Sequence, residues 1–82
     1  MERSPRQFKK EVNARVAGYI RKTRQRVGIS QMELSLQLGQ SPKFIFRIEK
    51  GYCEADVPQF MEIMEALWAD PSQAIREIAP DP

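Results

Sequence analysis

The sequence predicts an all-α domain of five helices joined by short turns, on three observations. Apolar residues recur at the three- and four-residue spacing of amphipathic helices, and they nowhere show the alternation that a half-buried strand requires. Ser or Asp, followed by Pro, Glu or Gln, precedes these apolar segments and marks helix starts. At 82 residues the chain has the size of one small domain.

The first helix is expected to run from Pro5 to about Arg26, with Ser4 as its N-cap and Gly28 just beyond its end. A second helix of about two turns follows Ser30, which opens an S-x-x-E capping box. The buried edge of the first helix recurs every four residues, at Val12, Val16 and Ile20.

The third helix is expected to open at Ser41 and Pro42, as N-cap and first helical residue, and to stop at Gly51. Asp56 is expected to cap a fourth helix, and Asp70 a fifth. The fourth helix has an apolar stripe at Val57, Phe60, Met64 and Leu67. The predicted core is Val16, Ile20, Ile29, Leu34, Leu38, Ile45, Ile48, Phe60, Ile63, Met64, Leu67 and Ile75.

The residue types present exclude several kinds of chemistry. Histidine is absent and Cys53 is the only cysteine, which excludes an internal disulfide, a Cys/His zinc site and His-dependent nucleophilic catalysis. We therefore expect no enzyme active site, no metal and no cofactor. No apolar run reaches the ~18 residues of a membrane span, and the single cysteine favours an intracellular, cytoplasmic protein.

Charge is distributed unevenly along the chain. Residues 1–50 contain 12 Lys and Arg against 4 Asp and Glu, a net charge of +8, whereas residues 51–82 contain 1 against 7, a net charge of −6. A basic half of this kind favours an acidic partner such as nucleic acid or a membrane surface.

The segment from Ile29 to Gly51 is the informative one for function. Two short capped helices separated by a turn at Gly39 are typical of a helix-turn-helix, whose second helix fits a major groove ~12 Å wide. The sequence patterns of residues 20–24, 27–34, 38–41 and 45–51, with residues 56–67 further on, resemble the lambda-repressor-like (Xre-type) helix-turn-helix family. The resemblance covers about residues 14–78.

This resemblance implies a compact five-helix lambda-repressor-like DNA-binding domain over residues 12–79, with the helix-turn-helix at about residues 30–50. Residues 1–11 then form a basic N-terminal extension of the first helix, and residues 80–82 a tail. The implied function is a sequence-specific double-stranded DNA-binding transcriptional regulator, a repressor that acts as a homodimer on an operator-like site.

Seven positions match the DNA-contacting positions of the family. Gln31 and Lys50 are implied to lie at phosphates, whereas Lys43 and Arg47, one helical turn apart, contact bases or phosphates. The full set is Gln31, Ser41, Pro42, Lys43, Phe46, Arg47 and Lys50.

Two departures from the family pattern affect this interface. The positions after Gly51, often basic in the family, are Tyr-Cys-Glu here, and we hypothesise that the basic extension (Arg3, Arg6, Lys9 and Lys10) compensates. Phe44 and Phe46 are two positions apart, so both cannot face the core, and one of them is expected to contact thymine methyls or a protein.

Some roles stay open at this point. Arg24 either belongs to a solvated charged face of the first helix or is structural and pairs with Glu33 or Glu49. Glu33 is expected to cap its helix. Trp68 and Met61 either pack under the fifth helix or form a dimer seam with Tyr52, Val57 and Ile78. The alternative functions are a protein–protein interaction module that keeps the helix-turn-helix fold, and a non-specific basic binder that uses residues 3–26.

Overall fold

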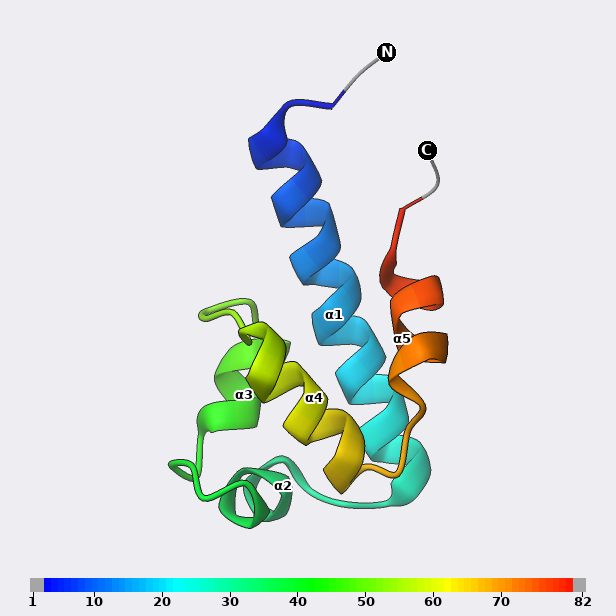
Figure 1. The fold of residues 1–82 in the computed structure, drawn as a ribbon. Helices are drawn as coiled ribbons and strands as arrows, with labels where there is room; N and C mark the ends of the chain where they lie inside the picture. Colours follow the sequence, from blue (N-terminus) through cyan, green and yellow to red (C-terminus); the bar gives the residue numbers. More distant parts are fainter. Residues whose placement is uncertain (1–2, 81–82) are drawn as a thin grey trace.

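The computed structural model describes residues 3–80, and all of their regular secondary structure is helical, as expected (Figure 1). None of the helices is long and apolar enough to cross a membrane, as far as the described residues go. The five helices are α1 (Pro5–Val27), α2 (Gln31–Gln37), α3 (Phe44–Glu49), α4 (Val57–Ala66) and α5 (Pro71–Ile78).

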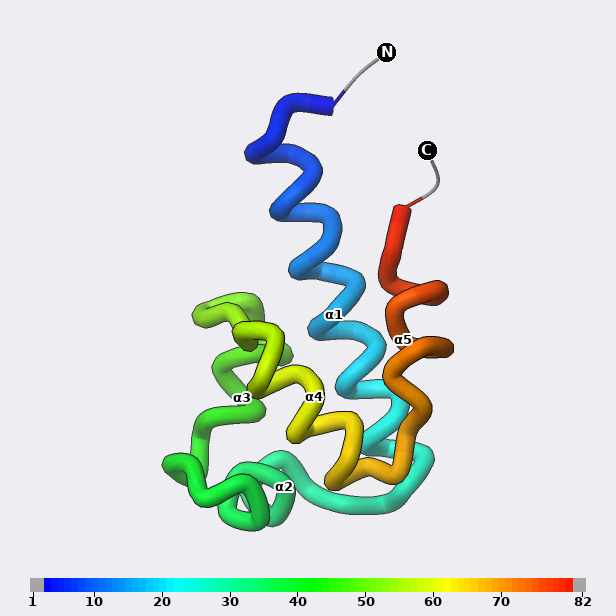
Figure 2. Tube along the Cα trace, in the orientation of Figure 1, coloured from blue at the N-terminus to red at the C-terminus, as the bar shows by residue number. Residues whose placement is uncertain are grey.

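The molecule measures 41 × 24 × 20 Å, and helix α1 lies along its longest dimension (Figure 1). Helix α5 runs back along α1, so that both described ends of the chain lie at the same end of the molecule (Figure 2). Helices α2, α3 and α4 pack beside the C-terminal part of α1, and the first turns of α1 project beyond them (Figure 1). An ion pair of 3.0 Å between Lys22 and Glu77 joins α1 to α5.

The helix boundaries follow the predicted caps in four of the five helices. Ser4 and Ser30 both accept a hydrogen bond from the backbone N–H of the third residue of their helix, and the capping boxes with Gln7 and Glu33 are complete. Asp56 caps α4 in the same way, with a capping box to Gln59, whereas the Asp70 carboxylate accepts a hydrogen bond from the Ser72 N–H, at the second residue of α5. Local sequence therefore sets these helix starts, because each cap satisfies N–H groups that have no partner within the helix.

The predicted start of the third helix is wrong. Helix α3 begins at Phe44, and its N-cap is Lys43, which makes no side-chain cap hydrogen bond. Ser41 and Pro42 instead form a turn, in which the Phe44 N–H donates to the Ser41 carbonyl at 3.0 Å. Proline suits the second position of such a turn as well as the first turn of a helix, so the Ser-Pro pattern allows both outcomes.

Most of the predicted core is buried in one cluster of residues. Ile20, Leu34, Ile45, Ile48, Phe60, Ile63, Met64 and Leu67 are buried, and Val16, Ile29 and Leu38 are partly buried against them. The prediction that Ile75 belongs to the core is wrong, since the residue is 55% exposed. In α5 the buried pair is Ala74 and Ile78, four residues apart, and this pairing turns Ile75 away from the core.

Three expectations about apolar residues outside the core need correction. Ile78 is buried, so it cannot belong to a dimer seam. Val57 is 76% exposed, and the buried stripe of α4 begins one turn later, at Phe60. Trp68 does not pack under α5: it follows α4 with a positive φ of 58° and is 94% exposed.

Candidate functional site

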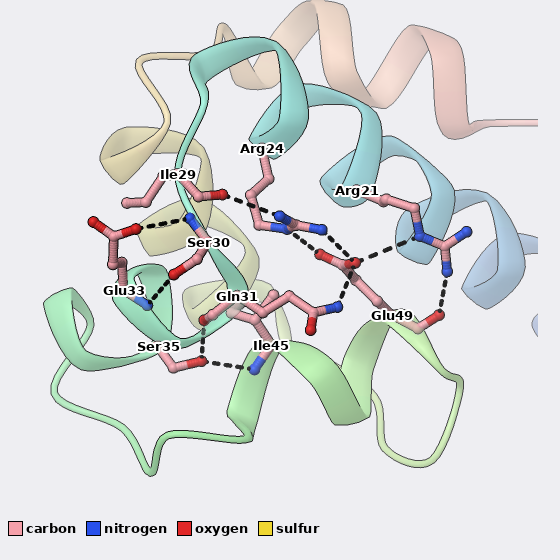
Figure 3. Close-up of polar contacts among 9 residues, drawn as sticks. All are labelled: Arg21, Arg24, Ile29, Ser30, Gln31, Glu33, Ser35, Ile45 and Glu49. Atoms are coloured by element: carbon pink, nitrogen blue, oxygen red, sulfur yellow. Dashed lines mark hydrogen bonds and ion pairs between the residues drawn. The ribbon is translucent and has the colours of Figure 1, made fainter.

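Helices α2 and α3 are held together by a buried serine (Figure 3). The Ser35 hydroxyl donates to the Gln31 carbonyl at 2.7 Å and accepts a hydrogen bond from the Ile45 N–H at 3.0 Å. Ile45 lies in the first turn of α3, where backbone N–H groups have no partner within the helix. Ser35 on α2 therefore supplies the cap that Ser41 was expected to supply.

The carboxylate of Glu49, the last residue of α3, is enclosed between three helices (Figure 3). Its side chain is only 1% exposed. The Arg24 guanidinium of α1 binds both carboxylate oxygens, with Nε–Oε2 at 2.7 Å and Nη2–Oε1 at 3.1 Å. The Gln31 amide of α2 donates to Oε1 at 3.0 Å. The two-point contact between Arg24 and Glu49 fixes the orientation of both side chains.

Arg21 completes this network from the preceding turn of α1. Its guanidinium donates to the Glu49 carbonyl at 3.1 Å and lies 3.5 Å from the carboxylate. Arg24 also donates to the Ile29 carbonyl at 3.0 Å. Together these contacts tie α3 to α1, and they settle the partner of Arg24 as Glu49, whereas Glu33 is confirmed as a cap.

The electrostatics of this network keep Glu49 charged. Burial of the carboxyl by itself raises the pKa. Hydrogen bonds from Arg24 and Gln31, the charge of Arg24 and a hydrogen bond from Arg21 outweigh burial, so the pKa of Glu49 lies below its usual range. The negative charge of Glu49, the only acidic residue of α3, is thus balanced by Arg24 on the inner side of the helix.

The outer side of α3 and its flanks carries cations around one aromatic ring. The Lys43 and Lys50 ammonium groups each lie 6.0 Å from the centre of the Phe46 ring. Tyr52 meets the same ring edge-on, with the ring centres 6.2 Å apart. Phe44 packs against the core instead, so the two phenylalanines occupy different surroundings, as their spacing requires.

The structure separates the predicted site residues into two groups. Lys43, Phe46 and Lys50 come together on the outer side of α3, and the exposed Arg47 lies on the same short helix. Ser41 and Pro42 are exposed in the turn that leads to it. Gln31 lies apart from this group, because its amide belongs to the inner network around Glu49.

The cations of α3 also differ from those of α1 in their pairing. Among residues 3–80, Lys43, Arg47 and Lys50 take part in no ion pair. Most basic residues of α1 do, and the paired ones include Lys9, Arg15, Arg21, Lys22 and Arg24. The outer side of α3 therefore presents positive charge with no local carboxylate to balance it.

Sequence reasoning missed Ser35 and Arg21 as determinants of the position of α3. Ser35 directly follows the core residue Leu34, and a small polar residue at such a place is the only local signal. Arg21 is three residues before Arg24 and therefore lies on the same side of α1. Its contact is to a backbone carbonyl, which no pattern of side chains reveals.

Comparison with models of protein families, with curated proteins and with solved structures gives no match. Within the described part of the chain, no three His, Cys, Asp or Glu side chains are grouped so that they could hold a metal ion. The features available for an inference about function are therefore the charge and the geometry around α3.

Proposed function

We propose that this protein is a sequence-specific double-stranded DNA-binding transcriptional regulator, a repressor, which reads the major groove with α3. One observation carries the proposal. Helix α3 keeps its only carboxylate buried against Arg24, while its outer side and flanks present Lys43, Arg47 and Lys50 to solvent. A surface of unpaired cations on a firmly held helix suits a polyanion that must be read in one register.

The packing of α2 and α3 supports a helix-turn-helix. The two helices are short, a six-residue segment joins them, and Ser35 connects them directly. In a helix-turn-helix the second helix enters the major groove and the first lies across the DNA backbone. We assign α3 to the groove and α2 to its support.

Each outer residue has a role in this proposal. Lys43 and Arg47 contact bases, guanine being the base that presents two acceptors to such side chains. Lys50, at the end of α3, contacts a phosphate. Phe46 contacts a thymine methyl through the part of its ring that remains exposed.

We further propose that the protein acts as a homodimer on a two-fold operator-like site. Val57 and Met61, one helical turn apart on α4, and Trp68, which follows its C-terminal end, are exposed apolar residues. Met and Trp are enriched at protein interfaces. Two copies would present their α3 helices to successive major grooves ~34 Å apart. Trp68→Ala should lower the sedimentation-equilibrium mass toward that of one chain, whereas Phe8→Ala, on the first turns of α1, serves as an exposed aromatic control outside the candidate seam.

The experiment that tests DNA reading is selection from a random duplex library, followed by binding of the selected and scrambled duplexes. Specific recognition predicts a palindromic consensus that binds ~10³-fold or more tightly than the scrambled duplex. Lys43→Ala with Arg47→Ala should weaken consensus binding by about 2 kcal/mol or more. Lys22→Ala with Arg76→Ala removes the same charge away from α3 and should leave the preference intact.

A protein–protein interaction module is the second candidate, favoured by the 94% exposed Trp68 and the 72% exposed Tyr52. Large exposed aromatic residues are typical of protein contacts. This function predicts that no duplex is enriched, and that the Lys43→Ala and Arg47→Ala variant captures its protein partner as well as the wild type does.

A further inference from the structure

A groove of about 660 Å³ lies between α1, from Arg6 to Arg21, and the end of α3 with the segment that links α3 to α4. Val16 and Ile48 are partly or fully buried among its lining residues, and Arg6, Lys10 and Lys50 line it with exposed side chains. The ribbon and the tube both show this linking segment beside the middle of α1 (Figures 1 and 2). An ion pair of 3.6 Å between Lys9 and Glu54 connects the two sides.

The charge of this groove is strongly positive. Its lining includes five Lys or Arg and two Glu. Glu49 is paired with Arg21, another cation of the lining, and is enclosed by Arg24 and Gln31. Glu54 is paired with Lys9. The remaining cations Arg6, Lys10 and Lys50 take part in no ion pair among residues 3–80, so they are available to an anionic ligand.

The groove is continuous with the outer side of α3 through one residue. Lys50 lines the groove, and its ammonium also lies over the Phe46 ring of α3. A ligand that lies on the outer side of α3 and extends past Lys50 into this groove reaches the space that Arg6 and Lys10 also line. DNA is a ligand of that form, since a duplex carries one phosphate per ~1.7 Å along its axis.

We propose that this groove binds the phosphate backbone of the duplex whose bases α3 reads, with Arg6, Lys10 and Lys50 at the phosphates. The inference rests on the proposed function and adds a second DNA-contacting element, the N-terminal half of α1. It also divides the basic extension in two. Arg3 and Lys9 are held by Glu11 and Glu54, whereas Arg6 and Lys10 contact DNA.

Glu54 makes a prediction of opposite sign possible. Its carboxylate is the unburied negative charge of the groove, and it holds Lys9. Glu54→Gln removes that charge and frees Lys9 for a phosphate. The variant should bind the selected duplex more tightly than the wild type and with a steeper dependence on salt.

The test measures the fluorescence anisotropy of the selected and the scrambled duplex at several KCl concentrations. Arg6→Ala with Lys10→Ala should weaken binding of both duplexes by at least about tenfold at 0.1 M salt, and should reduce the log–log salt slope by ~1.8. The ratio between the two duplexes should stay unchanged, because phosphate contacts carry no sequence information. The control is Lys22→Ala with Arg76→Ala, which removes the same charge from the α1 and α5 side.

The outcomes separate this inference from the proposed function. If the wild type prefers its selected duplex and the Arg6 and Lys10 variant has the salt slope of the control, the groove proposal alone is overturned. If the wild type prefers no duplex, the proposed function fails first. Binding of a poly-glutamate peptide through Arg6 and Lys10, without binding of DNA, would overturn the groove proposal in favour of an acidic protein partner.

Discussion

The two halves of α1 belong to one helix, yet they differ in what they contact. Residues 16–27 include the buried side chains Ala17, Tyr19, Ile20 and Thr23. In residues 5–15 no side chain is fully buried, and residues 5–10 are all exposed. The C-terminal half is therefore part of the core, whereas the N-terminal half carries the exposed cations Arg6 and Lys10 of the basic groove.

This difference shows how one helix serves two purposes. A helix of 23 residues extends about 34 Å, which is longer than the layer of helices packed against it (Figure 1). Tertiary contacts stabilise the packed half, and the other half depends mainly on its own hydrogen bonds and on the Ser4 cap. Substitutions in the two halves should therefore differ in their cost to stability.

The largest expected effect is in the packed half, at Arg24. Arg24→Ala leaves the Glu49 carboxylate buried with only Gln31 and Arg21 as donors. The removal of one partner from a buried ion pair typically costs about 3 kcal/mol or more. Urea unfolding followed by circular dichroism measures this loss.

A double variant separates the loss of the pair from the burial of an unpaired charge. Arg24→Met with Glu49→Met removes both charges, and replacement of a buried pair by apolar residues is often close to neutral. The double variant should therefore be clearly more stable than Arg24→Ala. Equal stability of the two variants would show that the carboxylate is not the source of the cost.

Acid should weaken the same contact. The pKa of Glu49 is lower in the folded protein than the ~4.3 of an unfolded glutamate, so its stabilisation is complete above that value and is lost as the pH falls through the folded pKa. One such group changes the free energy of unfolding by at most about 1.4 kcal/mol per pH unit. Urea titrations from pH 6 downward should show a smaller slope for Glu49→Gln than for the wild type.

Thr23 allows a stabilising change in the packed half. Its hydroxyl oxygen is buried and has no hydrogen-bond partner among the described residues. Thr23→Val keeps the branched shape and removes the unsatisfied group, which should raise the free energy of unfolding by about 1 kcal/mol. A fall in the thermal midpoint would instead indicate a partner for the hydroxyl.

The smallest effects come from a matched pair of helix caps. Ser30 and Ser4 form the same capping box, but Ser30 begins the packed helix α2 and Ser4 begins the exposed half of α1. Ser30→Ala should cost about 1 kcal/mol of global stability. Ser4→Ala should cost less than about 0.5 kcal/mol, because local fraying does not require the core to open. In the Ser4→Ala variant, amide hydrogen exchange should be faster than in the wild type only at residues 5–10.

The sequence predicted where the helices lie better than it predicted which face of each helix is buried. The caps at Ser4, Ser30, Asp56 and Asp70 are local, so their residues are sufficient to identify them. In α5 the apolar residues Ile75 and Ile78 are equally good core candidates by pattern. The packing of α5 on α1 selected Ile78 together with Ala74.

The candidate site shows the same limit. The pattern identified Lys43, Arg47 and Lys50 as cations near α3, and it left the partner of Arg24 open between two glutamates. The position of Glu49 between α1 and α2 decided that partner, and the Ser35 hydroxyl decided where α3 begins. Both decisions depend on residues 10 or more positions apart.

The sequence by itself therefore determined the all-α class, four helix starts, most of the core and the concentration of positive charge before residue 51. Only the tertiary structure decided which face of α3 is buried, which cations remain unpaired and where the groove beside α1 lies. The physical reason is the distance along the chain over which each interaction acts. Capping and helical periodicity act within about four residues, whereas burial and charge pairing depend on which helices meet.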